Sequence, residues 1–107
     1  MRKCEVYRNS SLVGILTEED DKTFKFEYDQ VYFNNNTCPA VSLTMPKNKG
    51  TYKSTYLFPF FANMLAEGVN KQLQLRQFQI NEKDQFGLLL ATSSQNTIGA
   101  VHVKEMV

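Results

Sequence analysis

In the first 28 residues, short segments rich in apolar positions are separated by polar ones, a pattern typical of β-strands and their turns. Lys3–Tyr7 and Leu12–Leu16 flank the polar segment Arg8–Ser11, which has the composition of a hairpin loop. In Thr23–Tyr28 aromatic residues alternate with charged ones, which predicts a strand with one face toward solvent. The simplest arrangement of these segments is a three-stranded antiparallel meander.

Further strands are predicted later in the chain. Val41, Leu43 and Met45 repeat the alternation, and Pro46 ends the strand because proline cannot donate a hydrogen bond to a ladder. Ile98–Val103 is expected to be a final strand added to the sheet. Three polar stretches are expected to form turns between elements: Thr17–Lys22, Asn34–Thr37 and Lys47–Lys53.

The middle of the chain predicts an amphipathic helix near residues 56–68. Ser54 or Thr55 can cap it, and Pro59 requires the helix to begin close by, because proline is favourable only in a first turn. Gly68 is expected to end this helix. At helical spacing six apolar side chains share the face that we expect in the core: Leu57, Phe58, Phe60, Phe61, Met64 and Leu65.

Two more helices are predicted after residue 68. Val69–Ile80 favours a helix over a strand, although its apolar residues are spaced ambiguously. Asp84 can cap a short third helix, Gln85–Thr92. The predicted fold class is therefore α+β: an antiparallel β-sheet, made of the N-terminal meander plus later strands, with two or three short α-helices packed on one face.

The composition fits a globular protein. The 107 residues, 42% apolar and 21% charged, are expected to form a single domain, residues 1–107. The formal net charge of +1 excludes a bulk attraction to nucleic acid or anionic lipid. The sequence shows no signal-peptide pattern and no membrane-spanning apolar run. A cytoplasmic protein with reduced thiols and no membrane association is expected.

No catalytic, cofactor-binding or metal-binding constellation is evident in the sequence. Cys4 and Cys38 lack metal-ligand spacing, and His102 lies in a predicted strand, where a structural role is expected. The acidic cluster Glu18–Asp21 lacks calcium-loop spacing and is interpreted as a solvated hairpin turn. Asp84–Gly87 (DQFG) superficially resembles a kinase motif, but the other kinase loops are absent, so we interpret it as a helix cap plus a core phenylalanine.

Four segments, in order and spacing, carry a resemblance to a known family. The opening EVYRNSSLVGILTEEDDKTFKFEYD is similar to that family's hairpin and aromatic third strand. Ala40–Pro46 (AVSLTMP) resembles its segment of alternating serine and leucine that ends in proline. Phe60–Gly68 (FFANMLAEG) is similar to Phe-Phe-x-Asn-Leu-Leu-Pro-Glu-Gly, and Ile98–Val101 (IGAV) to a Gly-Ala-Val strand. Together, over nearly the whole chain, they resemble N-terminal subdomain 1 of HipA-family kinases.

The resemblance implies a HipA N-terminal subdomain that exists as a separate chain, like the HipS proteins of split HipA-type toxin–antitoxin systems. In these bacterial systems the kinase is the toxin, a helix-turn-helix protein represses the operon, and the HipS-like chain can neutralise the kinase. The implied partner is a HipA-like serine/threonine kinase chain that lacks this subdomain, with the helix-turn-helix repressor in a ternary complex. No direct nucleic-acid binding is expected.

The chain departs from the family pattern at two places. Ala66 stands where the family has proline, so the helix is expected to run slightly further before Gly68. Ser94–Asn96 replaces the family's Gly-x-Asp, which removes a charge from a loop that could contact the kinase. Both departures bear on the strength or geometry of docking.

A subdomain that is normally fused to a kinase has a face that the kinase covers. Asn63 lies opposite the core face of the predicted helix, and Glu67 and Gly68 match the family motif. Alternatively, Asn63 caps a neighbouring loop and Glu67 is only solvated. The complete set of partner-binding candidates is Tyr56, Asn63, Glu67, Gly68, Asn70 and Arg76.

Three classes of function compete. The favoured one is a non-catalytic regulatory module that binds the kinase in trans and acts as its antitoxin. The second is an accessory subunit of a repressor complex that contacts operator DNA through the Lys47–Lys53 patch, where three lysines lie near Tyr52 and Tyr56. A solvated loop is the simpler interpretation of that patch. The third class, an independent enzyme, needs a perturbed titratable pair that the sequence does not indicate.

Overall fold

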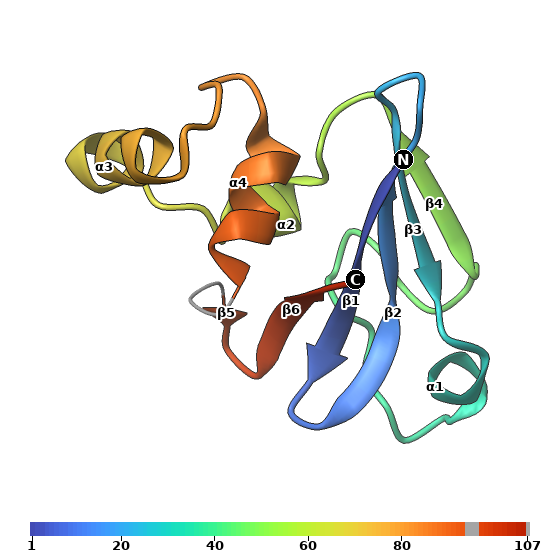
Figure 1. Ribbon diagram of the computed structural model, residues 1–107. Coiled ribbons are helices and arrows are strands. Elements are labelled where there is room, and N and C mark those ends of the chain that lie inside the picture. The colour runs from blue at the N-terminus through green and yellow to red at the C-terminus, as the bar shows by residue number, and fades with distance from the viewer. Residues whose placement is uncertain (94–96, 107) are drawn as a thin grey trace.

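One antiparallel sheet organises the part of the chain that the computed structural model describes, residues 1–93 and 97–106 (Figure 1). Its strands lie in the spatial order β4–β3–β2–β1–β6–β5. The strands are β1 (Arg2–Arg8), β2 (Ser11–Glu18), β3 (Phe24–Tyr28), β4 (Thr51–Ser54), β5 (Thr97–Ile98) and β6 (Val101–Glu105). The helices are α1 (Gln30–Asn34), α2 (Pro59–Ala62), α3 (Gly68–Phe78) and α4 (Gln85–Ala91). The predicted α+β class with an antiparallel sheet is confirmed.

The predicted N-terminal meander is also confirmed, because β1 pairs with β2 and β2 with β3, both antiparallel. Asn9 turns the first hairpin with a left-handed φ of 54°, a conformation that asparagine tolerates well. The β1–β2 register shifts between Val6 and Tyr7, which marks a β-bulge. Gly14 lies beside this bulge, and a Cβ atom there would be 2.3 Å from the Glu27 carbonyl oxygen. Only glycine therefore permits this close approach of β3.

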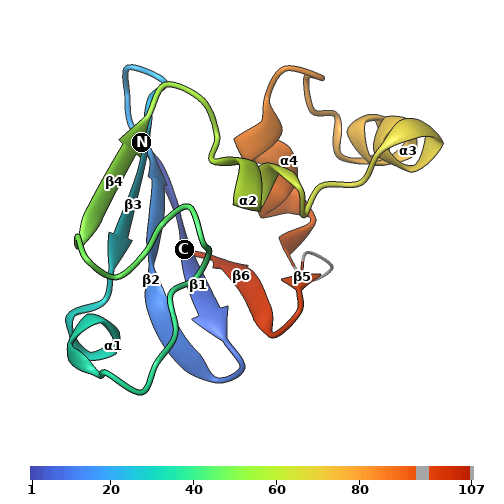
Figure 2. The ribbon, with the colours of Figure 1, turned by 180° about the vertical axis from the view of Figure 1, so that it is seen from behind.

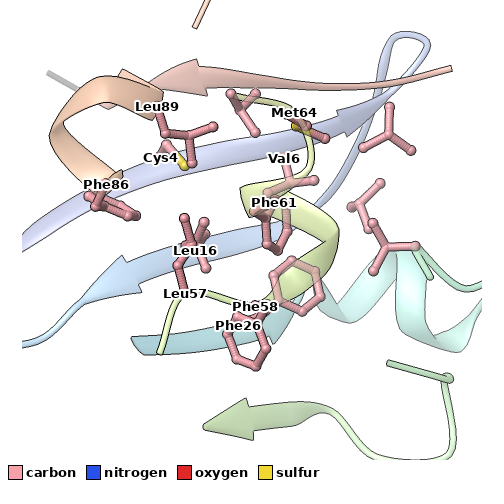
Figure 3. Close-up of a cluster of buried hydrophobic side chains, with 14 of the residues drawn as sticks. Cys4, Val6, Leu16, Phe26, Leu57, Phe58, Phe61, Met64, Phe86 and Leu89 are labelled. Carbon is pink, nitrogen blue, oxygen red and sulfur yellow. The ribbon is translucent and has the colours of Figure 1, made fainter. Parts of the chain in front are cut away.

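The core lies between one face of the sheet and the helices α2 and α4. Figure 3 shows Cys4 and Val6 of β1 and Leu16 of β2 near Phe61 of α2 and Leu89 of α4, and all five are fully buried. Burial of each such large apolar side chain contributes roughly 1.5–3 kcal/mol relative to exposure. Seen from behind, the segment between α1 and β4 crosses the sheet on the same side as α2 (Figure 2).

The strand predicted from Val41, Leu43 and Met45 is wrong. Val41 and Met45 are buried, but they flank a tight turn on which Leu43 is fully exposed. The Tyr28 hydroxyl fixes this turn, because it donates to the Met45 carbonyl and accepts from the Val41 amide at 3.1 Å. Val41 and Met45, two buried residues on either side of a turn, thus have the sequence spacing of alternate residues in a strand. The strand that pairs with β3 is instead β4, which lies partly within the expected turn Lys47–Lys53.

The helix predicted over residues 56–68 is shortened to the four residues of α2. Pro59 occupies the first turn, as predicted, but Phe58 is the N-cap residue and neither Ser54 nor Thr55 caps the helix. The chain then continues in tight turns that are closed by hydrogen bonds between residues three apart. The extension expected from Ala66 is therefore wrong as well.

The apolar set predicted for this helix is nevertheless in the core. Leu57, Phe58, Phe61, Met64 and Leu65 are buried, and Phe60 packs against them while partly exposed. The tight turns after α2 bring the last two of these side chains back to the core. Gly68, expected to end the first helix, begins α3 with a φ of 61°. Its left-handed backbone favours glycine at this reversal.

The later elements largely follow the prediction. α3 and α4 occupy the two ranges predicted to be helical, and the Asp84 side chain caps α4 by accepting from the Gly87 amide at 3.0 Å. The single strand expected over Ile98–Val103 is a hairpin of β5 and β6, in which Gly99 has a φ of 59°. β6 pairs antiparallel with β1 and so joins the sheet. The family departure at Ser94–Asn96 lies outside the described residues.

Candidate docking surfaces

Helix α3 is attached to the rest of the molecule by few of its side chains. All 11 of its residues are described, and Leu75 is the one that is buried. Val69 and Leu73 are 76% and 56% exposed. At the start of the helix, the Glu67 side chain makes no capping hydrogen bond. α3 thus presents apolar side chains to solvent that the core does not use.

These exposed residues line a surface groove of about 490 Å³, named here the α3 groove. It is formed by Gly68, Val69, Gln72, Leu73 and Arg76. Within the described ranges, the Arg76 guanidinium forms no ion pair, so its charge is available at the edge of the groove. An apolar floor beside an arginine is the composition that protein interfaces favour.

A smaller pocket of about 350 Å³, the α2–α3 pocket, adjoins the start of α3. Asn63, Glu67 and Gly68 line it together, and Gly68 also belongs to the α3 groove. Asn63 follows the end of α2 and is exposed, as its predicted position opposite the core requires. Lys71 and Gln85 supply the other polar groups of this pocket.

The structure therefore brings together four of the six predicted partner-binding residues, Asn63, Glu67, Gly68 and Arg76, along two adjoining hollows. Asn70 is exposed on α3 but lines neither hollow. Tyr56 is 79% exposed and lies at a different cleft. Sequence reasoning missed Val69 and Leu73. The available signal was the ambiguous apolar spacing of this helix, which does not describe one buried face.

The cleft beside Tyr56, named here the Arg2 cleft, lies between the first strands and α4 and encloses about 720 Å³. Arg2 Nη2 contacts Glu18 Oε1 at 2.6 Å and Asp84 Oδ1 at 2.7 Å. The guanidinium carbon also lies 5.5 Å from the centroid of the Phe86 ring. One arginine thus ties β1 to β2 and to the cap of α4.

Arg2 and Asp84 hold each other in their charged forms. The hydrogen bonds from Arg2 lower the pKa of the Asp84 carboxyl, and the Gly87 amide lowers it further, against a smaller effect of burial. The same hydrogen bond to Asp84 raises the pKa of the Arg2 guanidinium, although burial opposes it. Neither group is adjusted for proton transfer near neutral pH. The cluster links β1, β2 and the cap of α4. Glu18, which was expected in a solvated turn, is buried in this cluster.

In the Lys47–Lys53 patch, two lysine side chains make contacts within the chain. Lys47 Nζ donates to the carbonyls of Asn35 at 2.7 Å and Cys38 at 2.9 Å. Lys49 Nζ lies 4.8 Å from the centroid of the Tyr52 ring. A lysine whose donors are occupied by backbone carbonyls is poorly placed to bind phosphate, so the patch offers little for an operator contact.

The other residues considered for chemistry in the sequence include His102 and Cys4. The predicted strand position of His102 is confirmed, because it lies in β6, where its ring stacks on Tyr7 with 5.5 Å between ring centroids. Burial raises the pKa of the Cys4 thiol to about 12, which leaves it unreactive at neutral pH. Within the described residues, no three His, Cys, Asp or Glu side chains are grouped to hold a metal ion. In the same ranges no helix has the length and apolarity to cross a membrane.

Comparison with known proteins places this architecture in a family. A family model described as the HipA N-terminal domain matches residues 4–104. The chain belongs to the HipA N-terminal domain family. A Haemophilus influenzae protein, described as "Uncharacterized protein", is 32% identical over 105 residues, which span 98% of this chain and 93% of that protein.

Two solved structures are similar to this HipA N-terminal domain. The first is the "N-terminal domain of HipA toxin", with 25% identity and a TM-score of 0.73 over 100% of this chain and 94% of that one. The second is a chain from a Shewanella oneidensis MR-1 complex of HipA, HipB and operator DNA, with 22% identity and a TM-score of 0.78. The match covers 94% of this chain but 23% of that chain, and it shows the fold alone. The family links the chain to toxin–antitoxin systems.

Proposed function

We propose that the chain is a non-catalytic regulatory module that binds in trans to a HipA-like serine/threonine kinase and neutralises it. The kinase partner would lack its own N-terminal domain. The observation that carries this proposal is the exposed apolar surface of α3 within a HipA N-terminal domain. The proposed docking surface consists of the α3 groove and the α2–α3 pocket.

The packing of α3 supports a partner on this surface. Most helices in proteins are stabilised by tertiary packing of an apolar face, and short helices are marginal alone in water. α3 buries Leu75 alone among its residues, all of them described, while Val69 and Leu73 point away from the core. A partner that covers the groove would bury both side chains and surround Arg76. Such a central apolar patch with one arginine is the usual anchor of a specific interface.

The second solved structure supports the same idea from another direction. There the same fold makes up 23% of a longer chain in a complex that contains HipA, HipB and operator DNA. In that chain the domain has further protein beside it. We propose that the present chain meets its kinase as a separate partner and that a helix-turn-helix repressor joins the two in a ternary complex.

The kinase chain itself provides the test. The purified chain would be mixed with a HipA-like kinase from the same operon, and complex formation and kinase autophosphorylation would be measured. The wild-type chain should form a stoichiometric complex and suppress autophosphorylation. Absence of both effects would contradict the proposal.

A matched pair of substitutions then locates the surface. Val69 in the α3 groove and Val31 on α1 are equally exposed, at 76% and 79%. Val69→Asp should weaken the complex at least about tenfold, because it places a charge in the apolar centre of the interface. Val31→Asp should leave the affinity unchanged. Equal effects of the two substitutions would contradict the location, even if the complex forms.

A further inference from the structure

The Arg2 cleft lies outside the docking surface proposed above and has its own chemical character. Its floor combines the ion cluster of Arg2, Glu18 and Asp84 with the rings of Phe24 and Phe86. Its rim consists of exposed side chains from three separate connections and from the first residue of α4: Lys22, Thr55, Tyr56, Asn81, Lys83 and Gln85. The volume of about 720 Å³ is within the range of ligand-binding clefts.

The charge that is available in this cleft is positive. Both carboxylates of the lining, Glu18 and Asp84, are hydrogen-bonded to Arg2. Lys22 and Lys83 form no ion pair with any described residue. The lining carries three cations and two anions, so an incoming acidic group would be attracted to the two rim lysines.

The shape of the cleft favours a segment of another chain over a small molecule. Small-molecule sites usually enclose most of their ligand. Here the rim side chains are exposed, and Tyr56 presents 79% of its surface to solvent. Tyrosines are enriched at protein interfaces, where the ring supplies apolar area and the hydroxyl a hydrogen bond.

We propose that the Arg2 cleft binds an acidic segment of the HipA-like kinase chain, with Lys22 and Lys83 contacting its carboxylates and Tyr56 covering its apolar part. This inference rests on the proposed function and adds a second contact to the α3 groove. The ion cluster beneath the rim holds β1, β2 and the cap of α4 together, which are the elements next to the two lysines.

Charge reversal in the full-length chain tests this contact with the same kinase as probe. The double variant Lys22→Glu and Lys83→Glu should raise the dissociation constant for the kinase at least about tenfold at low salt, mainly through slower association. The effect should shrink at high salt, because ions screen exposed charges. The charge-conserving double variant Lys22→Arg and Lys83→Arg should bind like the wild type.

The matched control reverses two lysines elsewhere, Lys49→Glu and Lys104→Glu, which gives the same net charge. Both of these lysines are exposed and lie outside the Arg2 cleft. This control should bind the kinase within about twofold of the wild type, because rim charges act mainly near their own contacts. Thermal unfolding of every variant verifies that the fold is intact.

Each other outcome overturns the inference. If the wild-type chain binds the kinase and the cleft variant binds equally well, the Arg2 cleft is not a contact, while the proposed function stands. Equal weakening by both double reversals would mean a general charge effect. Operator DNA serves as a second probe in a gel-shift assay. If the cleft variant binds the kinase like the wild type but no longer binds operator DNA, the cleft is a nucleic-acid surface. If the wild-type chain does not bind the kinase, the proposed function and this inference fall together.

Discussion

The neighbouring helices α3 and α4 differ in how they are held. α4 has seven residues, four of which are buried: Phe86, Gly87, Leu88 and Leu89. α3 is longer, with 11 residues, but buries Leu75 alone, and the structure describes the whole helix. The Asp84 side chain caps α4, whereas Glu67 makes no capping hydrogen bond at α3. The comparison separates a helix that builds the core from one that is free to build an interface.

The largest difference is expected when a leucine in each helix is truncated. Leu89 in α4 is fully buried, so Leu89→Ala should reduce the free energy of unfolding by about 2–5 kcal/mol, since it removes packing and leaves a cavity. Leu73 in α3 is 56% exposed, and Leu73→Ala should cost less than about 0.5 kcal/mol. Denaturant unfolding of the free chain measures both values. Similar losses would show that α3 is also part of the core.

A smaller difference is expected at the two helix starts. Asp84→Ala removes the cap of α4 and one of the two partners of Arg2, and should cost about 1–2 kcal/mol. Glu67→Ala should change stability by less than about 0.5 kcal/mol, because the side chain makes no capping bond. The same unfolding experiment compares the two. A large loss for Glu67→Ala would contradict the description of the α3 start.

The smallest effect is a pH dependence that belongs to α4 and not to α3. The folded protein holds the pKa of Asp84 below its ordinary value, through the hydrogen bonds from Arg2. Its stabilisation is therefore complete above about pH 5 and is lost as the pH falls through the ordinary value of about 3.9 toward the lower folded value. Asp84→Asn should lose less stability than the wild type over this acidic interval. Parallel acid unfolding curves for the two proteins would contradict this assignment.

Much of the fold could be predicted because it depends on local patterns. The alternation in Thr23–Tyr28 identified β3, and Asp84 before an apolar run identified the start of α4. The same rule failed at Leu43, because two buried anchors around a turn give the spacing of a strand. It also overestimated α2, whose core residues after Phe61 are supplied by tight turns rather than by a continuing helix.

The candidate sites could be predicted only in part. The likeness to the family motif located Glu67 and Gly68, which do lie together with Asn63. No local signal joins Arg2 to Asp84, because these residues are 82 positions apart and meet only when the sheet and α4 pack. The exposure of Val69 is likewise a property of the tertiary structure, since an apolar residue in a helix is usually expected in the core.

Amide hydrogen exchange, with and without the kinase, tests the central claim most directly. In the free chain, amides of α3 should exchange faster than those of α4, because few buried contacts oppose local opening. In the complex, exchange in Gly68–Phe78 should slow at least about tenfold, whereas α1 should be unchanged. A kinase complex in which α3 exchanges as fast as in the free chain would contradict docking through this helix.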